Sequence, residues 1–475
     1  MNKNPEYDAV VVGAGPNGFS AAITLARNGL KVALLEAKSR TGGGVRSEFL
    51  TGENIYDLCS AVHPLAIASP VFQSMPLEDF GLNWVFPEIN LAHPFDDGTA
   101  AFLSSNLADL QFKFPDEHIF HKFFSAQLNN PDTLNFFFNP LKFSGSIFSY
   151  INLALNGIRS AENFSEKKII DEKLRSLFIG IAAHSGAKLS SPFTAAVGIL
   201  LLYLGLKSGW GFPAGGAQKL TEALMSYFLS LGGVIFTDFK VNKWDEIPSS
   251  KIVLFDLTPK QILKIMESRL PLLYKKELER YKYGPGSFKL DFVIEGEIPF
   301  TNTDVRKAGT VHLGGNYDEI ISSEENAFRG IISEKPFVLL AQQSNIDRSR
   351  VEKNKNVVWS YCHVPNNSEE DMTKKIENQV ERFAPGFKER IIYKKSTNAR
   401  AMEDYNSNYI GGDINGGLFA WNQMLTRPAI KFNPYKIPVK GYYICSSATP
   451  PGGGVHGVSG FNAAVSALKD FKIFK

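Results

Sequence analysis

The 475-residue sequence is poor in cysteine and carries no dominant charge. Its three cysteines, Cys59, Cys362 and Cys445, lie far apart and form no C-x-x-C pair, which excludes a local zinc cluster and a local redox disulfide and suits a reducing cytoplasm. The 51 basic and 48 acidic residues leave a net charge of +3, too balanced to indicate nucleic acid as a partner. We therefore expect a cytoplasmic protein that binds neither a metal cluster nor nucleic acid.

Long apolar runs and a secretion signal are also missing. The longest apolar run, Ala195 to Leu206, is too short to span a bilayer and is expected to form a buried helix or an interfacial segment. The first five residues contain no apolar core of a signal peptide, so secretion is not expected. The chain is long, and its 475 residues predict two or three domains rather than one hydrophobic core.

A glycine-rich turn follows the first predicted strand. Val10 to Val12 are expected to form a strand buried on both faces. Gly13 permits a tight turn, Gly15 lets the backbone approach phosphate oxygens, and Gly18 lets the next helix pack close to the strand. Amides at that helix N-terminus attract an anion. The turn therefore predicts a bound pyrophosphate.

A second strand and a second glycine-rich loop extend this motif. Lys31 to Leu35 are expected to form the strand, and Glu36 follows it roughly 20 residues beyond the glycines, where a carboxylate accepts a ribose hydroxyl. The loop contains Gly42 to Gly44 and then Arg46, which is expected to pair with the same pyrophosphate. The alternative is a solvated loop with a surface arginine.

The middle of the chain is rich in phenylalanine. Between about Pro70 and Leu206 the pattern predicts several helices with irregular joints, and the aromatic excess is more typical of a core than of a ligand pocket. Surplus apolar side chains would nevertheless suit a long apolar substrate. The chain then returns to the nucleotide domain through a helix over 220–231 and strands over 234–237 and 251–254, with Val241 placed to contact an adenine edge.

Two strands with period-two alternation, over 283–294 and 357–363, predict a sheet in a second domain. Lys289 and Asp291 share one face of the first strand, where we expect exposed charges, since most Lys and Asp side chains are solvated. Lys289 is also a candidate proton acceptor.

Another strand, glycine-rich turn and helix close the chain. The strand begins after Gly441, the turn spans 452–457, and the helix is expected over 462–468. A second helix N-terminus implies a second electron-rich ligand group, and an isoalloxazine ring gains negative charge near N1 when it is reduced. The two turns together predict FAD rather than NAD. His456, beside this helix, is the other candidate proton acceptor, although a structural role is an equal alternative for it and for Lys289.

Several motifs together resemble the phytoene dehydrogenase-like FAD-dependent oxidoreductases, which belong to the glutathione-reductase-type flavoproteins with the carotenoid desaturases, carotenoid isomerases and retinol saturases. The motifs that carry the resemblance are GAGPNG, TGGGVRSEF, DLCSAVHPL, GWGFPAGG, YGPGSFKLDFVIEGEIP, ERFAPGF, NYIGGDINGG and GYYICSSATPPGGGVHGVSGFNAA. The resemblance implies an α/β protein in which a Rossmann-like FAD-binding domain, a parallel sheet with helices on both faces, is interleaved with an α+β substrate domain. The implied FAD-binding parts are 1–69, 207–265 and 401–475, and the implied substrate-domain parts are 70–206 and 266–400.

The resemblance also implies the cofactor site, residue by residue. Gly13, Gly15 and Gly18 would contact the pyrophosphate, Glu36 the ribose and Val241 the adenine. Gly43, Gly44 and Arg46 would flank the phosphates, and Gly454, Val455 and Gly457 the flavin ring. Further implied contacts are Ala14, Pro16, Asn17, Ala37, Val45, Ser60, Ala61, Val62, His63, Ser446, Ser447 and His456.

One position departs from the family pattern. Many of these flavoproteins carry Gly-Asp or Gly-Glu before the final turn, and this sequence has Ser446-Ser447. A serine hydroxyl can still hydrogen-bond the cofactor, so we expect the protein to retain FAD, with weaker binding than in those flavoproteins.

The predicted activity is FAD-dependent dehydrogenation or isomerisation of an apolar polyene or isoprenoid, with a separate electron acceptor. The alternatives are a flavin amine oxidase and a non-redox escort protein that binds prenyl groups. A disulfide reductase is excluded, because paired cysteines and a second G-x-G-x-x-G are missing. Peripheral membrane contact stays open, because a lipid-like substrate resides there. The substrate and the oligomeric state stay undetermined.

Overall fold

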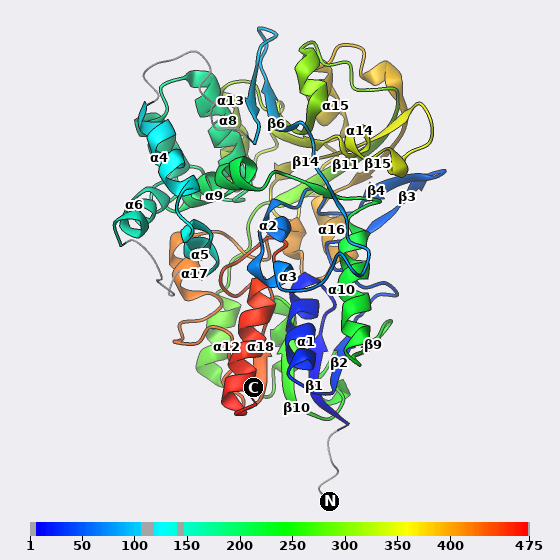
Figure 1. Ribbon diagram of the computed structural model, residues 1–475, viewed down its shortest axis with the longest axis vertical. Coiled ribbons are helices and arrows are strands. Elements are labelled where there is room, and N and C mark those ends of the chain that lie inside the picture. The colour runs from blue at the N-terminus through cyan, green and yellow to red at the C-terminus, as the bar shows by residue number, and fades with distance from the viewer. Residues whose placement is uncertain (1–5, 106–117, 140–146, 474–475) are drawn as a thin grey trace, which may run out of the picture.

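A computed structural model describes residues 6–105, 118–139 and 147–473 as two large sheets with helices around them (Figure 1). The lower sheet has five strands, and all its neighbouring strands run parallel. They come from the beginning, the middle and the end of the described chain. In spatial order they are β16 (Tyr442–Ile444), β10 (Ser250–Phe255), β1 (Tyr7–Val12), β2 (Val32–Leu35) and β9 (Val234–Phe236).

Helices cover both faces of this parallel sheet. Alternate residues of each strand point to opposite faces, so Val11 packs into one hydrophobic core and Val10 into another. The first face carries α1 (Pro16–Arg27), α10 (Gln218–Ser230) and α18 (Val458–Asp470). The second carries α11 (Pro259–Met266) and α12 (Leu272–Glu279). The predicted α/β class with a Rossmann-like sheet is confirmed, and α18 begins four residues earlier than predicted.

The first and last helices of the parallel-sheet domain touch closely. A Cβ atom on Gly460 of α18 would lie only 1.9 Å from the carbonyl oxygen of Asn17 in α1. A glycine at this position therefore lets the two helices approach each other, and it brings the beginnings of α1 and α18 side by side (Figure 1).

The second sheet is mixed and has seven strands. Both predicted strands, over 283–294 and 357–363, lie inside it. β6 (Ile89–Pro94) and β7 (Ala100–Leu103) come from the phenylalanine-rich stretch, for which the sequence predicted helices alone; β7 forms one edge of the sheet and β6 lies between it and β12. In spatial order the strands are β15 (Ile391–Thr397), β11 (Gly286–Glu295), β14 (Lys355–Val364), β13 (Val338–Ala341), β12 (Ala308–Leu313), β6 (Ile89–Pro94) and β7 (Ala100–Leu103).

A helical layer lies beside the second sheet (Figure 1). The predicted apolar helix is confirmed as α9, and phenylalanines such as Phe124, Phe164 and Phe178 pack in one core with it. Phe112, Phe114 and Phe143 of the aromatic stretch lie outside the described residues. The layer consists of α4 (His118–Leu128), α5 (Thr133–Phe138), α6 (Ile147–Gly157), α7 (Ala161–Lys168), α8 (Glu172–Ala183) and α9 (Thr194–Lys207).

The remaining elements lie between the two sheets or pack on the second sheet. The boundaries of the two domains stay predictions. The further strands are β3 (Ser47–Thr51), β4 (Asn54–Asp57), β5 (Trp84–Val85) and β8 (Phe212–Pro213). The further helices are α2 (Pro64–Ile67), α3 (Pro70–Gln73), α13 (Tyr317–Arg329), α14 (Gln343–Ile346), α15 (Thr373–Phe383), α16 (Ala399–Tyr405) and α17 (Trp421–Thr426). In the described part of the chain, no helix combines the length and the hydropathy that crossing a membrane requires.

The expectation that Lys289 and Asp291 are exposed is wrong. They are 2% and 1% exposed, because β11 lies between β14 and β15 with both of its faces covered. Lys289 Nζ and Asp291 Oδ2 form an ion pair, which lets both charges stay inside the fold.

Candidate active site

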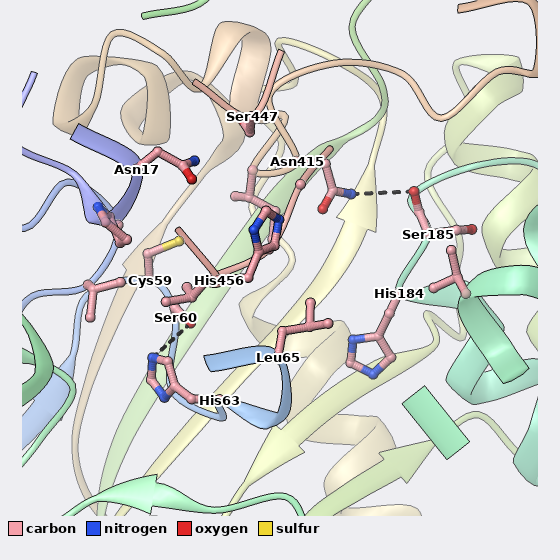
Figure 2. Close-up of a pocket in the computed structure, with 18 of the residues that line it drawn as sticks. Asn17, Cys59, Ser60, His63, Leu65, His184, Ser185, Asn415, Ser447 and His456 are labelled. Atoms are coloured by element: carbon pink, nitrogen blue, oxygen red, sulfur yellow. Dashed lines mark hydrogen bonds between the residues drawn. The ribbon is translucent and has the colours of Figure 1, made fainter. Parts of the chain in front are cut away.

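The two glycine-rich loops border one cavity of about 430 Å³. Gly15, Pro16 and Asn17 reach it from the N-terminal loop, and residues 453–456 reach it from the C-terminal loop. In Figure 2, Asn17 lies on one side of the cavity, His184 and Ser185 on the opposite side, and His456 between them. Distant parts of the sequence therefore meet as the glycine motifs predicted.

The N-terminal turn has the geometry of an anion site. Gly13 has a φ of +103°, and a Cβ on Gly18 would lie 1.9 Å from the Gly13 carbonyl oxygen. α1 begins directly after Gly15, which has no side chain to cap the helix. A Cβ on Gly43 of the second loop would lie 3.2 Å from the Gly15 Cα, so the two loops pack backbone against backbone. These glycines leave a narrow space where backbone can approach a ligand.

Most of the predicted cofactor residues line this cavity, and the others lie behind it. Those that line it are Gly15, Pro16, Asn17, Gly43, Gly44, Val45, Ser60, Ala61, Val62, His63, Ser446, Ser447, Gly454, Val455 and His456. Those outside its lining are Gly13, Ala14, Gly18, Glu36, Ala37, Arg46, Val241 and Gly457.

Glu36 and Arg46 contact each other behind the turn. Glu36 Oε2 accepts a hydrogen bond from the amide of Ala14 at 3.1 Å, and Glu36 Oε1 lies 3.4 Å from Arg46 Nη2. The Arg46 Nε donates to the carbonyl of Thr41. In this arrangement Glu36 and Arg46 stabilise the glycine loops. The contacts of these two side chains with ribose and phosphate stay predictions.

The two candidate proton acceptors have different surroundings. Lys289 lies outside the main cavity, in a smaller one of about 200 Å³ beside Asp291 and Tyr56, and burial lowers the pKa of its ammonium group. His456 lines the main cavity, and burial lowers its pKa to about 4. Its Nε2 lies 3.2 Å from the Gly452 carbonyl, and its Nδ1 accepts a hydrogen bond from the amide of Val458. Both ring nitrogens are therefore engaged in holding the C-terminal loop.

The second sheet contributes a polar pair that sequence reasoning missed. Trp359, Tyr361 and His363 alternate along β14 and line the cavity. The Nδ1 of His363 lies 2.7 Å from Glu324 Oε2, and both side chains are buried. Burial alone would lower the pKa of His363, but the charge of Glu324 and its hydrogen bond outweigh burial and raise it. His184, on the same cavity, lies 3.1 Å from His312 through their Nε2 atoms.

Arg427 is a second residue that sequence reasoning missed. It lines the cavity, it is 3% exposed, and its Nη2 donates to the hydroxyl of Tyr281 and to the carbonyl of Ser447, both at 3.0 Å. Its Nε has no hydrogen-bond partner, and no described carboxylate lies within ion-pair distance of it. The charge of Arg427 acts on the buried carboxyl group of Asp413 without a direct ion pair, so the guanidinium still favours a further anionic group such as a ligand phosphate. The unpartnered Oδ1 of Asn17 also faces this space. These atoms and the glycine loops fit a dinucleotide such as FAD.

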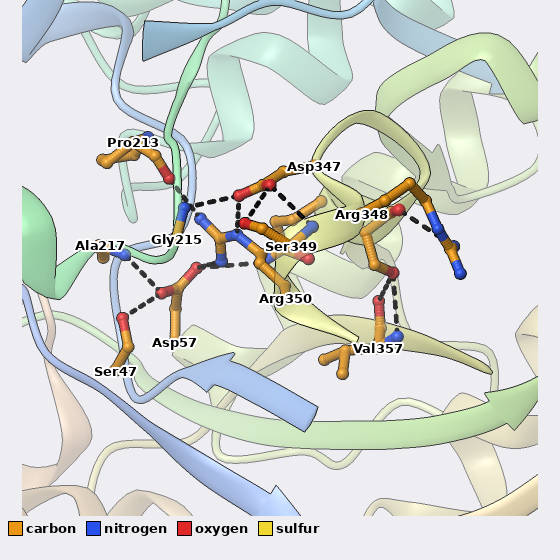
Figure 3. Close-up of polar contacts among 12 residues, drawn as sticks. Ser47, Asp57, Pro213, Gly215, Ala217, Asp347, Arg348, Ser349, Arg350 and Val357 are labelled. Atoms are coloured by element: carbon orange, nitrogen blue, oxygen red, sulfur yellow. Dashed lines mark hydrogen bonds and ion pairs between the residues drawn. The ribbon is translucent and has the colours of Figure 1, made fainter. Parts of the chain in front are cut away.

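A buried ion network supports the segment that leads to the cavity (Figure 3). Asp57 Oδ2 accepts from Arg350 Nη1 at 2.7 Å, while Asp57 Oδ1 accepts from the Ser47 hydroxyl and the Ala217 amide. Arg350 also bonds Asp347, which accepts from the amide of Gly215 at 2.6 Å. The network joins the β3–β4 hairpin, the segment before α10 and the turn between α14 and β14. Cys59 and Ser60, which line the cavity, lie two and three residues after Asp57.

The remaining walls are mostly apolar. Helices α5 and α9 face the second sheet across the cavity, and no described group of histidine, cysteine and acidic side chains has the arrangement of a metal site. All three cysteines are buried and unpaired. The apolar side chains on the walls include Leu65, Phe137, Phe138, Val197, Leu200, Leu201, Trp210 and Leu339.

Comparison with known proteins agrees with this architecture. Residues 11–75 match the NAD(P)-binding Rossmann-like domain family. The chain is 24% identical to the mouse (Mus musculus) pyridine nucleotide-disulfide oxidoreductase domain-containing protein 2, over 98% of this chain and 94% of that protein. It is 21% identical to the 1-hydroxycarotenoid 3,4-desaturase of Flavobacterium sp. (strain P99-3), over 64% of this chain and 71% of that protein.

The fold is also similar to that of a triple mutant of putrescine oxidase, with a TM-score of 0.63, 16% identity, and coverage of 98% of this chain and 99% of that chain. The match at residues 11–75 and the parallel sheet identify a Rossmann-like nucleotide-binding unit, and the chain as a whole shares the fold of putrescine oxidase.

Proposed function

We propose that the protein binds FAD and dehydrogenates or isomerises an apolar, polyene-like or isoprenoid substrate. One observation carries this proposal: both glycine-rich loops border a single cavity whose other walls are mostly apolar. A dinucleotide at the loops and an apolar molecule between α5, α9 and the second sheet would meet inside one space. The likeness to a carotenoid desaturase supports the same substrate class.

The two loops would hold two different parts of FAD. Neither α1 nor α18 is capped by the side chain of its N-cap residue. One amide in each first turn already has a side-chain acceptor, Asp256 for Gly18 and His456 for Val458, so FAD would use the other amides or share these two. The start of α1 suits the pyrophosphate. The start of α18 suits the ring, because a helix N-terminus stabilises the negative charge that reduction places near N1. When bound, FAD supplies the hydride acceptor of the proposed reaction.

The residues of the chain would orient the substrate, exclude water and accept a proton. Dehydrogenation removes a hydride from one atom and a proton from its neighbour. His363 is the candidate acceptor of that proton, because Glu324 holds its Nδ1 and would stabilise the imidazolium that forms. Lys289 lies off the cavity and His456 has both ring nitrogens engaged, so neither suits this role as well. A separate electron acceptor would complete the cycle.

Amine oxidation is the second candidate function. The rings of Trp359 and Tyr361 lie 5.2 Å apart at an angle of 71° on the cavity wall. Two aromatic rings beside the His363–Glu324 pair are able to receive a cationic amine. The resemblance to putrescine oxidase is one of fold and does not by itself favour an amine.

Reduction of the bound flavin tests both candidates. The purified protein is expected to be yellow, whereas a non-redox escort protein would lack this colour. Under anaerobic conditions the flavin absorbance is followed after adding carotenoid precursors, retinoids or amines. Bleaching by polyenes supports the proposal, and bleaching by amines alone replaces it with the second candidate. Reoxidation by dioxygen or a quinone then identifies the class of electron acceptor.

A pair of variants separates substrate entry from flavin binding. Leu200→Trp places a larger side chain on the apolar wall and should slow bleaching by bulky substrates at unchanged flavin content. Leu229→Trp is the matched control, because Leu229 lies on α10 and is 47% exposed. Equal bleaching rates for the two variants would contradict the assignment of this wall to the substrate.

A further inference from the structure

The side chain of Asp256 lies inside the N-terminal glycine turn. Asp256 directly follows β10, whose carboxyl end meets that of β1. Its Oδ2 accepts a hydrogen bond from the amide of Gly18 at 2.9 Å, and a Cβ on Gly15 would lie 2.7 Å from the same oxygen. The backbone of Asp256 is fixed by Val12 and by the side chain of Asn408. The carboxyl group therefore has a defined place on the cavity wall.

This carboxyl group uses amides that an incoming pyrophosphate would also use. The amides at the start of α1 are the groups that hold an anion in this motif. A charged Asp256 would compete for them and would repel the phosphates at short range. A neutral Asp256 would instead donate a hydrogen bond to a phosphate oxygen while its other oxygen keeps the Gly18 amide.

The charged groups around Asp256 favour its neutral form. Glu36, which follows the neighbouring strand β2, raises the pKa of Asp256, and the Cys445 thiol beyond β16 supplies no positive charge. Arg46 pairs with Glu36, and Arg427 bonds Tyr281 and Ser447. No described Lys or Arg forms an ion pair with Asp256. Burial, together with the charge of Glu36, outweighs the hydrogen bonds from the Gly18 and Gly15 amides, which favour the charged form, and raises the pKa of Asp256 to about 7.

We propose that Asp256 is a proton-dependent binding residue for the dinucleotide: the site accepts the pyrophosphate when Asp256 carries a proton and loses affinity when that proton leaves. The proposal rests on FAD as the ligand of the proposed function. FAD affinity is then constant at low pH and falls about tenfold per pH unit above the pKa of Asp256. Binding near neutral pH takes up a proton.

Titration of the FAD-free protein with FAD tests this inference through the quenching of flavin fluorescence. The wild type, Asp256→Asn and Asp8→Asn are compared between about pH 6 and about pH 8.5, a range that brackets the expected transition. Asp8 is the matched control, because it lies at the opposite end of β1 and binds the Lys31 amide. We expect the wild type and Asp8→Asn to lose about tenfold in affinity per pH unit at the alkaline end, and Asp256→Asn to show a flat profile.

Two further measurements keep the inference testable even if a variant fails to fold. Riboflavin lacks the pyrophosphate, so its affinity for the wild type should show no such slope. Proton uptake by the wild type on adding FAD, followed with a pH indicator in weak buffer, should approach about one proton per FAD at alkaline pH. A slope that survives in Asp256→Asn, or FAD binding without proton uptake, overturns the role of Asp256. A wild type that binds no FAD at any pH overturns the proposed function itself.

Discussion

Replacement of Arg350 by methionine should destabilise the protein strongly at neutral pH. Arg350 is 1% exposed and pairs with Asp57 and Asp347 in the network of Figure 3. Arg350→Met leaves the fully buried Asp57 without its counter-ion. Removing one partner of a buried ion pair costs about 3–5 kcal/mol, and we expect a loss of this size in the free energy of unfolding. Urea unfolding followed by circular dichroism measures it.

The pH dependence of this loss identifies its cause. Burial alone would raise the pKa of Asp57, but the charge of Arg350 and the hydrogen bonds from Ser47 and Ala217 outweigh burial and lower it. In the wild type, Asp57 therefore contributes stability above its unfolded pKa of about 3.9, and this is lost as pH falls through the folded value. In Arg350→Met, burial raises the pKa instead. The difference from wild type should then be smaller at about pH 5 than at about pH 7.

Two controls complete the experiment. Arg348 lies two residues away on the same short helical turn and is exposed, so Arg348→Met should cost less than about 1 kcal/mol. The double variant Asp57→Asn/Arg350→Met removes both charges and should recover part of the lost stability. A loss below about 1 kcal/mol for Arg350→Met, or a loss that does not change with pH, would refute the reasoning.

Three further predictions concern the helix contact and the other buried charges. Gly460→Ala places a Cβ 1.9 Å from the Asn17 carbonyl, so unfolding and FAD titration should show a loss of about 1–3 kcal/mol and weaker FAD affinity; two unchanged values would contradict the contact. Glu324→Gln removes the charge that raises the pKa of His363. In the wild type, this pair stabilises the fold fully below the unfolded pKa of His, about 6.5, and the stabilisation is lost as pH rises through the folded pKa. The destabilisation of Glu324→Gln in urea should therefore be larger at about pH 6 than at about pH 9, and the reverse order would count against the pair. Lys289→Met leaves Asp291 unpaired and should lower the free energy of unfolding by about 3–5 kcal/mol at unchanged FAD affinity. A loss of FAD affinity without a loss of stability would instead indicate that Lys289 belongs to the FAD site.

Local sequence signals were sufficient for the parallel-sheet domain. Each of its strands is a short apolar run next to glycine or polar residues, as in Val10 to Val12 before Gly13. Such strands are buried on both faces, so every position in the run is apolar and the pattern is visible without tertiary information. The close approach of α1 and α18 was also foreseen in part, because both helices follow glycine-rich turns.

The polar residues of the cavity could not be predicted in this way. His363 and Glu324 belong to a strand and a helix and meet only when the second sheet forms. Asp256 could have been noticed, because a carboxylate directly after a buried parallel strand lies at the edge where ligands bind. Lys289 and Asp291 were misjudged because period-two alternation does not reveal whether a strand is central, and here a charge pair occupies the buried face.

The position of the cavity follows from how the two sheets meet. The carboxyl ends of β1 and β10 present amides and the Asp256 carboxyl group, and β14 presents aromatic rings and His363. One wall thus suits the dinucleotide of the proposed function, and the other its apolar substrate. Among the described residues, Arg427 acts on the buried Asp413 only without a direct ion pair, and no cationic side chain forms an ion pair with Asp256. Because uncompensated buried charges are costly, the proposed function assigns part of the charge balance of this cavity to the ligand, and the proposed proton on Asp256 contributes to that balance.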